Sequence, residues 1–386
     1  MHVVIVGGGV MGAATACFLA RDHGAAVTVL ERDPAYTRAS SALSASSIRQ
    51  QFSQPANIAL SRWSVAFLRR VGDELAVGDD HPAIGLVEPG YLFLAAAAAA
   101  DALRANHAVQ HAAGADIVLL DPAALRERFA WLATDDLALG ALGQSGEGWF
   151  DGPALMQALR RKAIACGARF VAAEATAFDT AADHVAKVRC SDGTRHAGDA
   201  VVIAAGAWSA PLAARLGAGL PVHPRKRDVF VFDAPALLHG CPLVVDPSGL
   251  WFRPEGRGFL CGAPPRHGDP DEPPLEAIDH GLFDEVIWPA LANRVPAFEA
   301  LRLRSAWAGY YEMNDFDHNG LAGALPGWSN AYTACGFSGH GMQQAPAVGC
   351  ALAALIAGGT CDAPDLAPLA PARVARGEPL RERNVI

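Results

Sequence analysis

Two glycine-rich turns in this sequence have the composition of anion-binding sites. The first spans residues 7–12 (GGGVMG) and the second spans residues 336–341 (GFSGHG). Each turn follows a short apolar run and precedes an apolar stretch typical of a helix. The first amides of a helix have no partner within it and lie at the positive end of the helix dipole, so they stabilise an anionic group. Both turns are therefore candidate contacts for a charged cofactor.

The first turn lies inside a complete β-α-β unit. Residues 3–6 predict a buried strand, residues 13–21 a helix, and residues 27–30 a second strand that ends on Glu31. Strand, glycines, helix, second strand and acid follow in the order of a dinucleotide-binding unit. The alternative is an ordinary glycine-rich turn between a strand and a helix. The complete order favours the dinucleotide interpretation.

Each special residue of this unit has a physical role in that interpretation. Gly7 permits the tight turn, Gly9 lets the backbone approach a pyrophosphate, and Gly12 lets helix and strand pack closely. Glu31 would accept hydrogen bonds from the adenosine ribose. The pattern fits the ADP half of FAD or of NAD, whereas the acid at position 31 disfavours the 2′-phosphate of NADP.

The second turn stands between a predicted strand at residues 331–334 and a predicted helix at residues 342–357. Reduced flavin carries negative charge near N1 and the C2 carbonyl, which a helix N-terminus stabilises. The alternative is a helix start whose glycines only avoid steric clashes. The turn by itself favours neither interpretation.

The composition indicates an acidic protein with enough apolar residues for two cores. Its 386 residues include 40 acidic and 31 basic side chains, and the net charge of −9 disfavours a nucleic-acid partner. The eight cysteines form no C-x-x-C pair, so we expect neither a metal site nor a disulfide framework, and a cytoplasmic location. We expect no signal peptide and no membrane span, while peripheral association with a membrane stays open.

The rest of the chain alternates predicted helices and strands without a repeat of fixed period. The polar residues 38–55 predict a binding loop, Asp121 opens a short helix, and Asp151 is a candidate N-cap. A Pro- and Asp-rich loop is expected at residues 264–274. We expect further helices at residues 57–70, 95–113 and 154–166, and strands at residues 90–94, 201–208, 229–232, 249–252 and 258–261.

Six motifs carry a resemblance to a known family. With them the chain resembles, over nearly its full length, the D-amino acid oxidase and sarcosine oxidase (DAO) superfamily of FAD enzymes. Within it the chain is most similar to FAD-dependent oxidoreductase-domain proteins, whose mitochondrial member is linked to assembly of respiratory complex I. The motifs are residues 39–44 (ASSALS), 48–55 (IRQQFSQP), 147–151 (EGWFD), 224–227 (PRKR), 307–312 (WAGYYE) and 336–344 (GFSGHGMQQ).

The resemblance implies an α/β fold with two interleaved domains. One is a Rossmann-like FAD-binding domain of the glutathione-reductase type, and the other is a substrate domain built on an antiparallel sheet. We expect the FAD-binding domain at residues 1–84, 147–218 and 319–386, and the substrate domain at residues 85–146 and 219–318.

The resemblance also implies FAD rather than NAD. It places Ser40 and Ser41 near the pyrophosphate or flavin, Thr176 near the adenine, and residues 339–343 at the pyrimidine end of the flavin. The expected cofactor contacts are Gly7, Gly9, Val10, Met11, Gly12, Glu31, Arg32, Ser40, Ser41, Thr176, Ala205, Gly206, Trp208, Gly339, His340, Gly341, Met342 and Gln343.

The activity implied is oxidation of the C–N bond of a small amino acid or N-alkyl amino acid. Hydride transfer to flavin N5 gives an imine, which hydrolyses. Arg49 matches the arginine that binds the substrate carboxylate in sarcosine-oxidase-like enzymes, with a structural salt bridge as the alternative. Tyr311 matches a substrate-side tyrosine, although Tyr310 and Tyr311 are equally suited to packing. His340 is a candidate catalytic residue beside the flavin, or a structural cap.

Three departures from the sarcosine-oxidase pattern change what is expected. Gln343 stands where a lysine would bind the carboxylate, so the substrate differs from sarcosine. Gly309 stands where covalently flavinylated relatives have cysteine, so we expect non-covalent FAD. The lysine that promotes reaction with oxygen is replaced near Leu260, which suggests a dehydrogenase that passes electrons to a quinone or another acceptor.

Two other function classes stay open. One is a flavin-dependent 2-hydroxy acid dehydrogenase of the same superfamily. The other is an assembly protein for a respiratory complex that keeps FAD for structural reasons.

Overall fold

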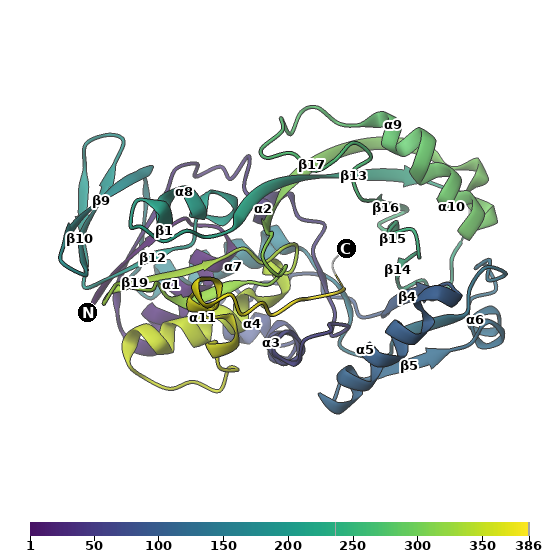
Figure 1. The fold of residues 1–386 in the computed structure, drawn as a ribbon, viewed down its shortest axis with the longest axis horizontal. Coiled ribbons are helices and arrows are strands. Elements are labelled where there is room, and N and C mark those ends of the chain that lie inside the picture. The colour runs from purple at the N-terminus through teal and green to yellow at the C-terminus, as the bar shows by residue number, and fades with distance from the viewer. Residues whose placement is uncertain (236, 385–386) are drawn as a thin grey trace.

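The computed structural model describes residues 1–235 and 237–384, which form two halves side by side (Figure 1). One half holds a six-stranded sheet and both glycine-rich turns, and the other holds an eight-stranded sheet. The N-terminus lies at the outer end of the first half, while the C-terminal segment runs back toward the middle of the molecule.

The chain begins with the predicted β-α-β unit. Strand β1 (His2–Val6) pairs in parallel with β2 (Ala26–Glu31), and helix α1 (Val10–His23) connects them. The helix begins at Val10 rather than at residue 13, because the glycine turn itself forms its first turn and Gly9 is the N-cap. Gly24 ends the helix in the left-handed conformation, the usual role of glycine at this position.

The six-stranded sheet has the order β18-β19-β12-β1-β2-β8. All neighbours are parallel except β18, which runs antiparallel to β19. The central strands are buried along nearly their whole length, as expected for a parallel sheet covered on both faces. The strands not yet given are β8 (Arg169–Ala172), β12 (Ala200–Ile203), β18 (Leu321–Ala324) and β19 (Ala331–Cys335).

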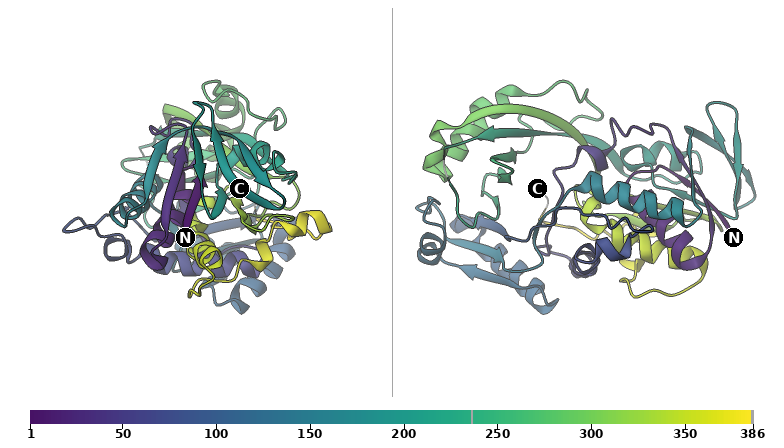
Figure 2. Two further views of the ribbon diagram at one scale, coloured as in Figure 1. Left: turned by 90° about the vertical axis from the view of Figure 1, so that its left-hand side faces the viewer. Right: turned by 180° about the vertical axis from the view of Figure 1, so that it is seen from behind.

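Helices cover one face of this sheet and a small sheet covers the other. Helix α1 packs against α7 (Gly152–Ala165) and α11 (Gly341–Ala357), and α11 also packs against α3 (Pro55–Leu68). Asp151 caps α7 as predicted, since its side chain accepts a hydrogen bond from the Ala154 amide at 2.8 Å. On the opposite face lie α8 (Ser209–Ala214), β9 (Ala175–Ala181), β10 (His184–Cys190) and β11 (Arg195–Ala197). Figure 2 shows from behind that this small sheet stands beside the N-terminus.

The second half is built on an eight-stranded sheet of order β17-β13-β16-β15-β14-β4-β6-β5. Its neighbours are antiparallel except β14 and β4, which are parallel, so the expectation of an antiparallel sheet needs this correction. These two strands come from segments far apart in the chain, and no hairpin turn constrains their direction. The strands are β4 (Tyr91–Ala95), β5 (Ile117–Leu120), β6 (Leu139–Gly143), β13 (Val222–Asp233), β14 (Leu243–Val245), β15 (Trp251–Glu255), β16 (Gly258–Gly262) and β17 (Arg302–Asn314).

Two long strands connect the halves. Strands β13 and β17 pair in antiparallel fashion from Val222 opposite Asn314 to Asp233 opposite Arg302, and Figure 1 shows them running from one half to the other. The sequence predicted only residues 229–232 as a strand, because the polar residues before them lack an apolar alternation. Pairing with β17 along their whole length keeps these polar residues extended.

Several predicted boundaries were wrong. The strand expected at residues 201–208 ends at Ile203, and Gly206–Trp208 form a 3-10 turn. Ala95 belongs to β4 rather than to the alanine-rich helix, because pairing with β6 overrides its helix propensity. The loop at residues 38–55 contains the short helix α2 (Ser40–Leu43) and the short strand β3 (Ser47–Ile48).

No helix in the described part of the chain is both long enough and apolar enough to cross a bilayer. The predicted domain boundaries stay a prediction. The remaining elements are α4 (Val71–Glu74), α5 (Ala100–Ala112) with a 3-10 turn before it (Ala97–Ala99), α6 (Pro122–Arg128), β7 (Gly148–Trp149), α9 (His280–Leu282), a π-helical turn (Phe283–Ile287), α10 (Trp288–Arg294), two further 3-10 turns (Pro296–Ala300 and Ala367–Leu369) and α12 (Ala372–Arg376).

Candidate active site

Two cavities meet at the junction of the halves. The smaller cavity, of about 370 Å³, lies at the carboxyl ends of β1 and β2. The larger cavity, of about 510 Å³, lies beside β13 and β17 and reaches the second glycine-rich turn. Val10, Ser40, Ser41 and Glu312 line both cavities, so the two spaces adjoin there.

The smaller cavity brings together most of the residues predicted to contact the ADP half of a cofactor. Gly12 is predicted for this region but does not line the cavity, because it packs inside the turn. The predicted residues that line it are Gly7, Gly9, Val10, Met11, Glu31, Arg32, Ser40, Ser41, Thr176, Ala205, Gly206 and Trp208.

The geometry of the first turn requires its glycines. Gly7 has φ +101°, and a Cβ there would lie 2.3 Å from the carbonyl oxygen of Ala204. A Cβ on Gly12 would lie 1.9 Å from the carbonyl oxygen of Gly7. Neither distance is tolerable for a carbon atom, so the turn can close this tightly only with glycine at both positions.

Two side chains fix this turn by hydrogen bonds. The Glu31 carboxylate accepts from the Gly8 amide at 2.7 Å and from the Asp33 amide at 2.8 Å. Each carboxylate oxygen keeps a further lone pair that a ribose hydroxyl can use. Ser41 Oγ accepts from the Val10 amide at 2.9 Å, so a residue 31 positions away holds the start of α1.

Arg32 and Trp208, which both line the smaller cavity, contact each other. The Arg32 guanidinium lies 4.0 Å from the centre of the Trp208 ring, close enough for a cation–π interaction. The exposed Thr176 side chain donates to the carbonyl of Arg189 at 3.3 Å. These residues give the cavity a flat, partly aromatic end.

Arg49 is the most buried charged group at the larger cavity. Its side chain is 1% exposed, and its guanidinium lies 4.2 Å from the centre of the Phe52 ring. It donates to the carbonyls of Gln51 and Asn384, both neutral acceptors. In the described part of the chain Arg49 therefore does not form the structural salt bridge that was the alternative interpretation.

His340 touches Arg49 although the two are 291 positions apart. Its Nε2 lies 3.2 Å from Nη2 of Arg49. Because a guanidinium only donates, Nε2 must accept, which leaves the imidazole neutral with its proton on Nδ1. Burial and the nearby Arg49 charge hold the pKa of His340 well below its usual value, in agreement with a neutral ring.

The second turn and Tyr311 complete the wall around Arg49. Gln343 Oε1 accepts from the Arg49 amide at 2.9 Å, so this residue fixes the backbone of the arginine. A Cβ on Gly339 would lie 2.6 Å from the Tyr311 ring, which shows how closely the turn packs on it. Gly339, His340, Gly341, Met342 and Gln343 all line the larger cavity, and their contact with the flavin stays a prediction.

The two adjacent tyrosines have different surroundings. The Tyr311 ring lines the larger cavity and has the Arg227 guanidinium 5.3 Å from its centre. The Tyr310 ring packs edge-on against Trp208, and its hydroxyl donates to the carbonyl of Pro273 at 2.6 Å. Both tyrosines line the larger cavity, but only Tyr310 is held by these packing contacts, so Tyr311 is the better candidate for a substrate contact.

The DAO family model of FAD-dependent oxidoreductases matches residues 2–355. The chain belongs to this family. It is 41% identical over 425 aligned positions to FAD-dependent oxidoreductase domain-containing protein 1 of Xenopus laevis, covering 100% of this chain and 84% of that protein. It is 31% identical over 362 positions to glycine oxidase of Geobacillus kaustophilus, covering 92% of each. The crystal structure of L-proline dehydrogenase from P. horikoshii matches with a TM-score of 0.86, 26% identity and 98% coverage of each chain.

Family membership confirms the predicted fold class, the FAD cofactor and the oxidoreductase class. The cavities fit this cofactor on two observations. A side chain on Gly9 would approach Ser41 Oγ at 3.2 Å, so glycine keeps the backbone open where a pyrophosphate would lie. Glu312, where the cavities meet, has a buried carboxyl oxygen that has no hydrogen-bond partner among the described residues.

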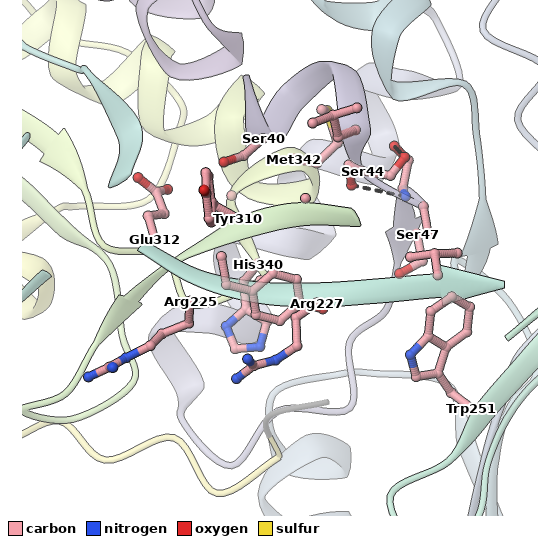
Figure 3. A pocket seen from close by; sticks show the side chains of 18 of the residues that line it. Ser40, Ser44, Ser47, Arg225, Arg227, Trp251, Tyr310, Glu312, His340 and Met342 are labelled. Carbon is pink, nitrogen blue, oxygen red and sulfur yellow. Dashed lines mark hydrogen bonds between the residues drawn. The ribbon is translucent and has the colours of Figure 1, made fainter. Parts of the chain in front are cut away.

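The sequence missed several residues of the larger cavity. Arg225 and Arg227 project from β13 on the side where His340 lies, while Glu312 lies on the other side with Ser40 (Figure 3). Arg225 pairs with Asp315 at 2.8 Å, and Arg227 forms a two-pronged pair with Asp269. The spacing of two within the PRKR motif would have placed both arginines on one face of a strand. Tyr91 and Trp251 also line the cavity, but no local pattern marks them.

Proposed function

We propose that this FAD-dependent oxidoreductase oxidises the carbon–nitrogen bond of a small amino acid or N-alkyl amino acid. The observation that supports this is the buried guanidinium of Arg49, which borders the larger cavity and is bonded only to neutral groups in the described residues. A buried arginine of this kind suits a carboxylate, which pairs with it by charge-assisted hydrogen bonds. The names of two relatives, glycine oxidase and L-proline dehydrogenase, are those of enzymes acting on amino acids.

Each protein side chain has a defined part in this proposal. When bound, FAD supplies the acceptor for the hydride of the substrate. Arg49 binds the substrate carboxylate, and Tyr311 borders the space where the rest of the substrate lies. His340 keeps its proton on Nδ1 and accepts at Nε2 from Arg49. We therefore assign to His340 the positioning of Arg49 rather than acid–base catalysis.

The proposal includes a dissociable FAD and an electron acceptor other than oxygen. Neither cysteine nor lysine occurs among the residues that line the two cavities. A cysteinyl link to the flavin therefore has no thiol to use there, and no ammonium group is available to promote reaction with oxygen. Leu260, near the position where sarcosine oxidases have this lysine, is buried in β16.

Anaerobic reduction of bound FAD tests the proposal. A panel of amino acids, N-methyl amino acids, opines and 2-hydroxy acids is added, and bleaching of the flavin absorbance is followed. We expect bleaching by an amine. Bleaching by hydroxy acids alone would favour the 2-hydroxy acid dehydrogenase, and bleaching by none would favour an assembly protein. Air added to the reduced enzyme then tests the acceptor, since reoxidation as fast as turnover would contradict a dehydrogenase.

Substitution of Arg49 tests the carboxylate site itself. Arg49→Ala should raise the substrate dissociation constant by about 30-fold, or about 2 kcal/mol, because a charged hydrogen bond is lost. Titration of the flavin spectrum with substrate measures this. Arg62→Ala removes an exposed arginine remote from both cavities and should change nothing. Equal dissociation constants for both variants would refute the assignment.

A further inference from the structure

Glu312 is a partly exposed acid with one buried carboxyl oxygen, and the proposed reaction does not use it. It lies near the end of β17, and its backbone carbonyl accepts from the Ser338 amide at 3.1 Å. Its Oε2 atom is buried and has no hydrogen-bond partner within the described residues. Burial raises the pKa of this carboxyl to about 7, against the opposing effect of the Gly336 and Phe337 amides.

A buried carboxyl oxygen without a partner destabilises the fold unless a bound molecule supplies a hydrogen-bond donor to it. Leaving a buried polar group without its partner costs about 1–3 kcal/mol, whereas an apolar side chain of similar size would pack there without that cost. Among the described residues, the shift in the pKa of Glu312 comes from burial and two backbone amides, with no charged side chain among its causes. The position therefore points to a ligand that brings hydrogen-bonding groups of its own.

The place of Glu312 identifies the part of the ligand that passes it. Glu312 lines both cavities. The β-α-β residues expected to bind adenosine line the smaller cavity, and the turn expected to meet the flavin ring lines the larger one. FAD that occupies both cavities has its middle where they meet. Carbon atoms added at Gly206 and Gly341 would lie 3.8 Å and 3.3 Å from the Glu312 carboxyl oxygens, so glycine leaves this side of the carboxyl open.

The middle of FAD consists of the pyrophosphate and the ribityl chain. The pyrophosphate is an anion and suits the amides at the start of α1, beside Val10 and Ser41. A carboxyl oxygen suits hydroxyl donors instead, and the ribityl chain carries three of them. We propose that Glu312 binds FAD at the ribityl chain, by accepting a hydrogen bond from one of its hydroxyl groups.

Binding of FAD and of ADP to the apoprotein tests this contact without any substrate. Glu312→Ala should weaken FAD about tenfold, which corresponds to the loss of one hydrogen bond, and leave ADP within twofold because ADP has no ribityl chain. Flavin fluorescence quenching measures FAD, and displacement of a fluorescent ADP analogue measures ADP. Glu312→Gln keeps an acceptor oxygen and should bind FAD within about threefold of the wild type. Glu299→Ala, at an exposed acid, is the matched control.

FAD analogues that each lack one ribityl hydroxyl locate the contact. The analogue that lacks the contacted hydroxyl should bind the wild type about tenfold more weakly than FAD. It should bind Glu312→Ala as tightly as it binds the wild type, because both changes remove the same hydrogen bond. The proposal is overturned if FAD affinity is unchanged, if ADP weakens as much as FAD, or if every analogue loses as much affinity in the variant as FAD does. If an apoprotein cannot be prepared, the FAD content of the purified variants after dialysis gives the same ranking: wild type and Gln above Ala.

Discussion

Glu147 holds the segment that carries Arg49. The carboxyl group is fully buried, and it accepts from the Gln50 amide at 2.6 Å and from Gln51 Nε2 at 2.8 Å. Burial raises the pKa of Glu147 to about 7, although these hydrogen bonds and the Arg49 charge oppose the shift. The protonation state of Glu147 therefore affects the segment that positions Arg49.

The stability of the protein should show this titration. A carboxyl whose pKa is about 7 when folded and near 4.5 when unfolded binds its proton more tightly in the folded state. Its contribution is complete below the unfolded pKa and is lost as pH rises through the folded pKa, at most about 1.4 kcal/mol per pH unit. Glu147→Gln lacks this contribution, so its destabilisation relative to the wild type should shrink from pH 5.5 to pH 8.

Urea unfolding at both pH values measures this difference in the free energy of unfolding. His340 and Glu312 are present in both proteins, so their titrations cancel to first order in the comparison. The exposed Glu299→Gln is the control and should follow the wild type at each pH. A difference that stays constant or grows with pH would show that Glu147 is ionised in the folded protein.

Helices α1 and α11 carry the two glycine-rich turns at their N-termini, and they pack against each other. Their close approach depends on small residues, since a Cβ on Gly349 would lie 2.6 Å from Ala14 Cβ and 2.8 Å from the Ala14 carbonyl carbon. The distance between the helices therefore determines the distance between the two cofactor turns.

Gly349→Ala should force these helices apart. We expect a loss of about 1–3 kcal/mol in the free energy of unfolding, as for overpacking of a tight core, together with weaker binding of FAD. Gly219→Ala is the matched control, because a Cβ there meets nothing within 4 Å. Thermal unfolding and FAD fluorescence measure both effects. Equal stability of the two variants would show that the Gly349–Ala14 contact can relax, and that it does not determine the distance between the turns.

The C-terminal segment joins the sheet of one half to the Arg49 region between the halves. Arg373 and Asp317 form a buried ion pair at 2.9 Å, with side chains 5% and 0% exposed. Glu382 accepts from the amide and hydroxyl of Ser53, each at 2.8 Å, and the Asn384 carbonyl accepts from Arg49. This path connects the outer part of the molecule to the candidate active site.

Breaking the ion pair should therefore affect the whole molecule. Arg373→Met leaves the Asp317 charge buried without its partner and should cost about 3–5 kcal/mol. Adding Asp317→Asn removes that charge and should recover part of the loss. Urea unfolding of the single and double variants measures this. Arg376→Met, which removes an exposed ion pair with Glu378, should cost less than about 1 kcal/mol. No recovery in the double variant would show that lost packing, and not the buried charge, causes the effect.

The local sequence pattern was sufficient to predict the structure of the cofactor-binding unit at the start of the chain. The unit from β1 to Glu31 was predicted from 31 residues because its strand, turn, helix and second strand contact one another within that span. The Asp151 cap and the strand and turn before α11 were predicted for the same reason, since their contacts are local. With the family motifs, these elements also indicated FAD, which family membership confirms.

Only the tertiary structure decided which distant residues share a cavity. Arg49 meets His340 across 291 positions, β4 pairs in parallel with β14, and Glu312 lies where two cavities adjoin. Even the separate surroundings of Tyr310 and Tyr311 depend on the register of β17 against β13. Local spacing carries no information on these contacts, because they follow from how complete elements pack and not from the order of neighbouring residues.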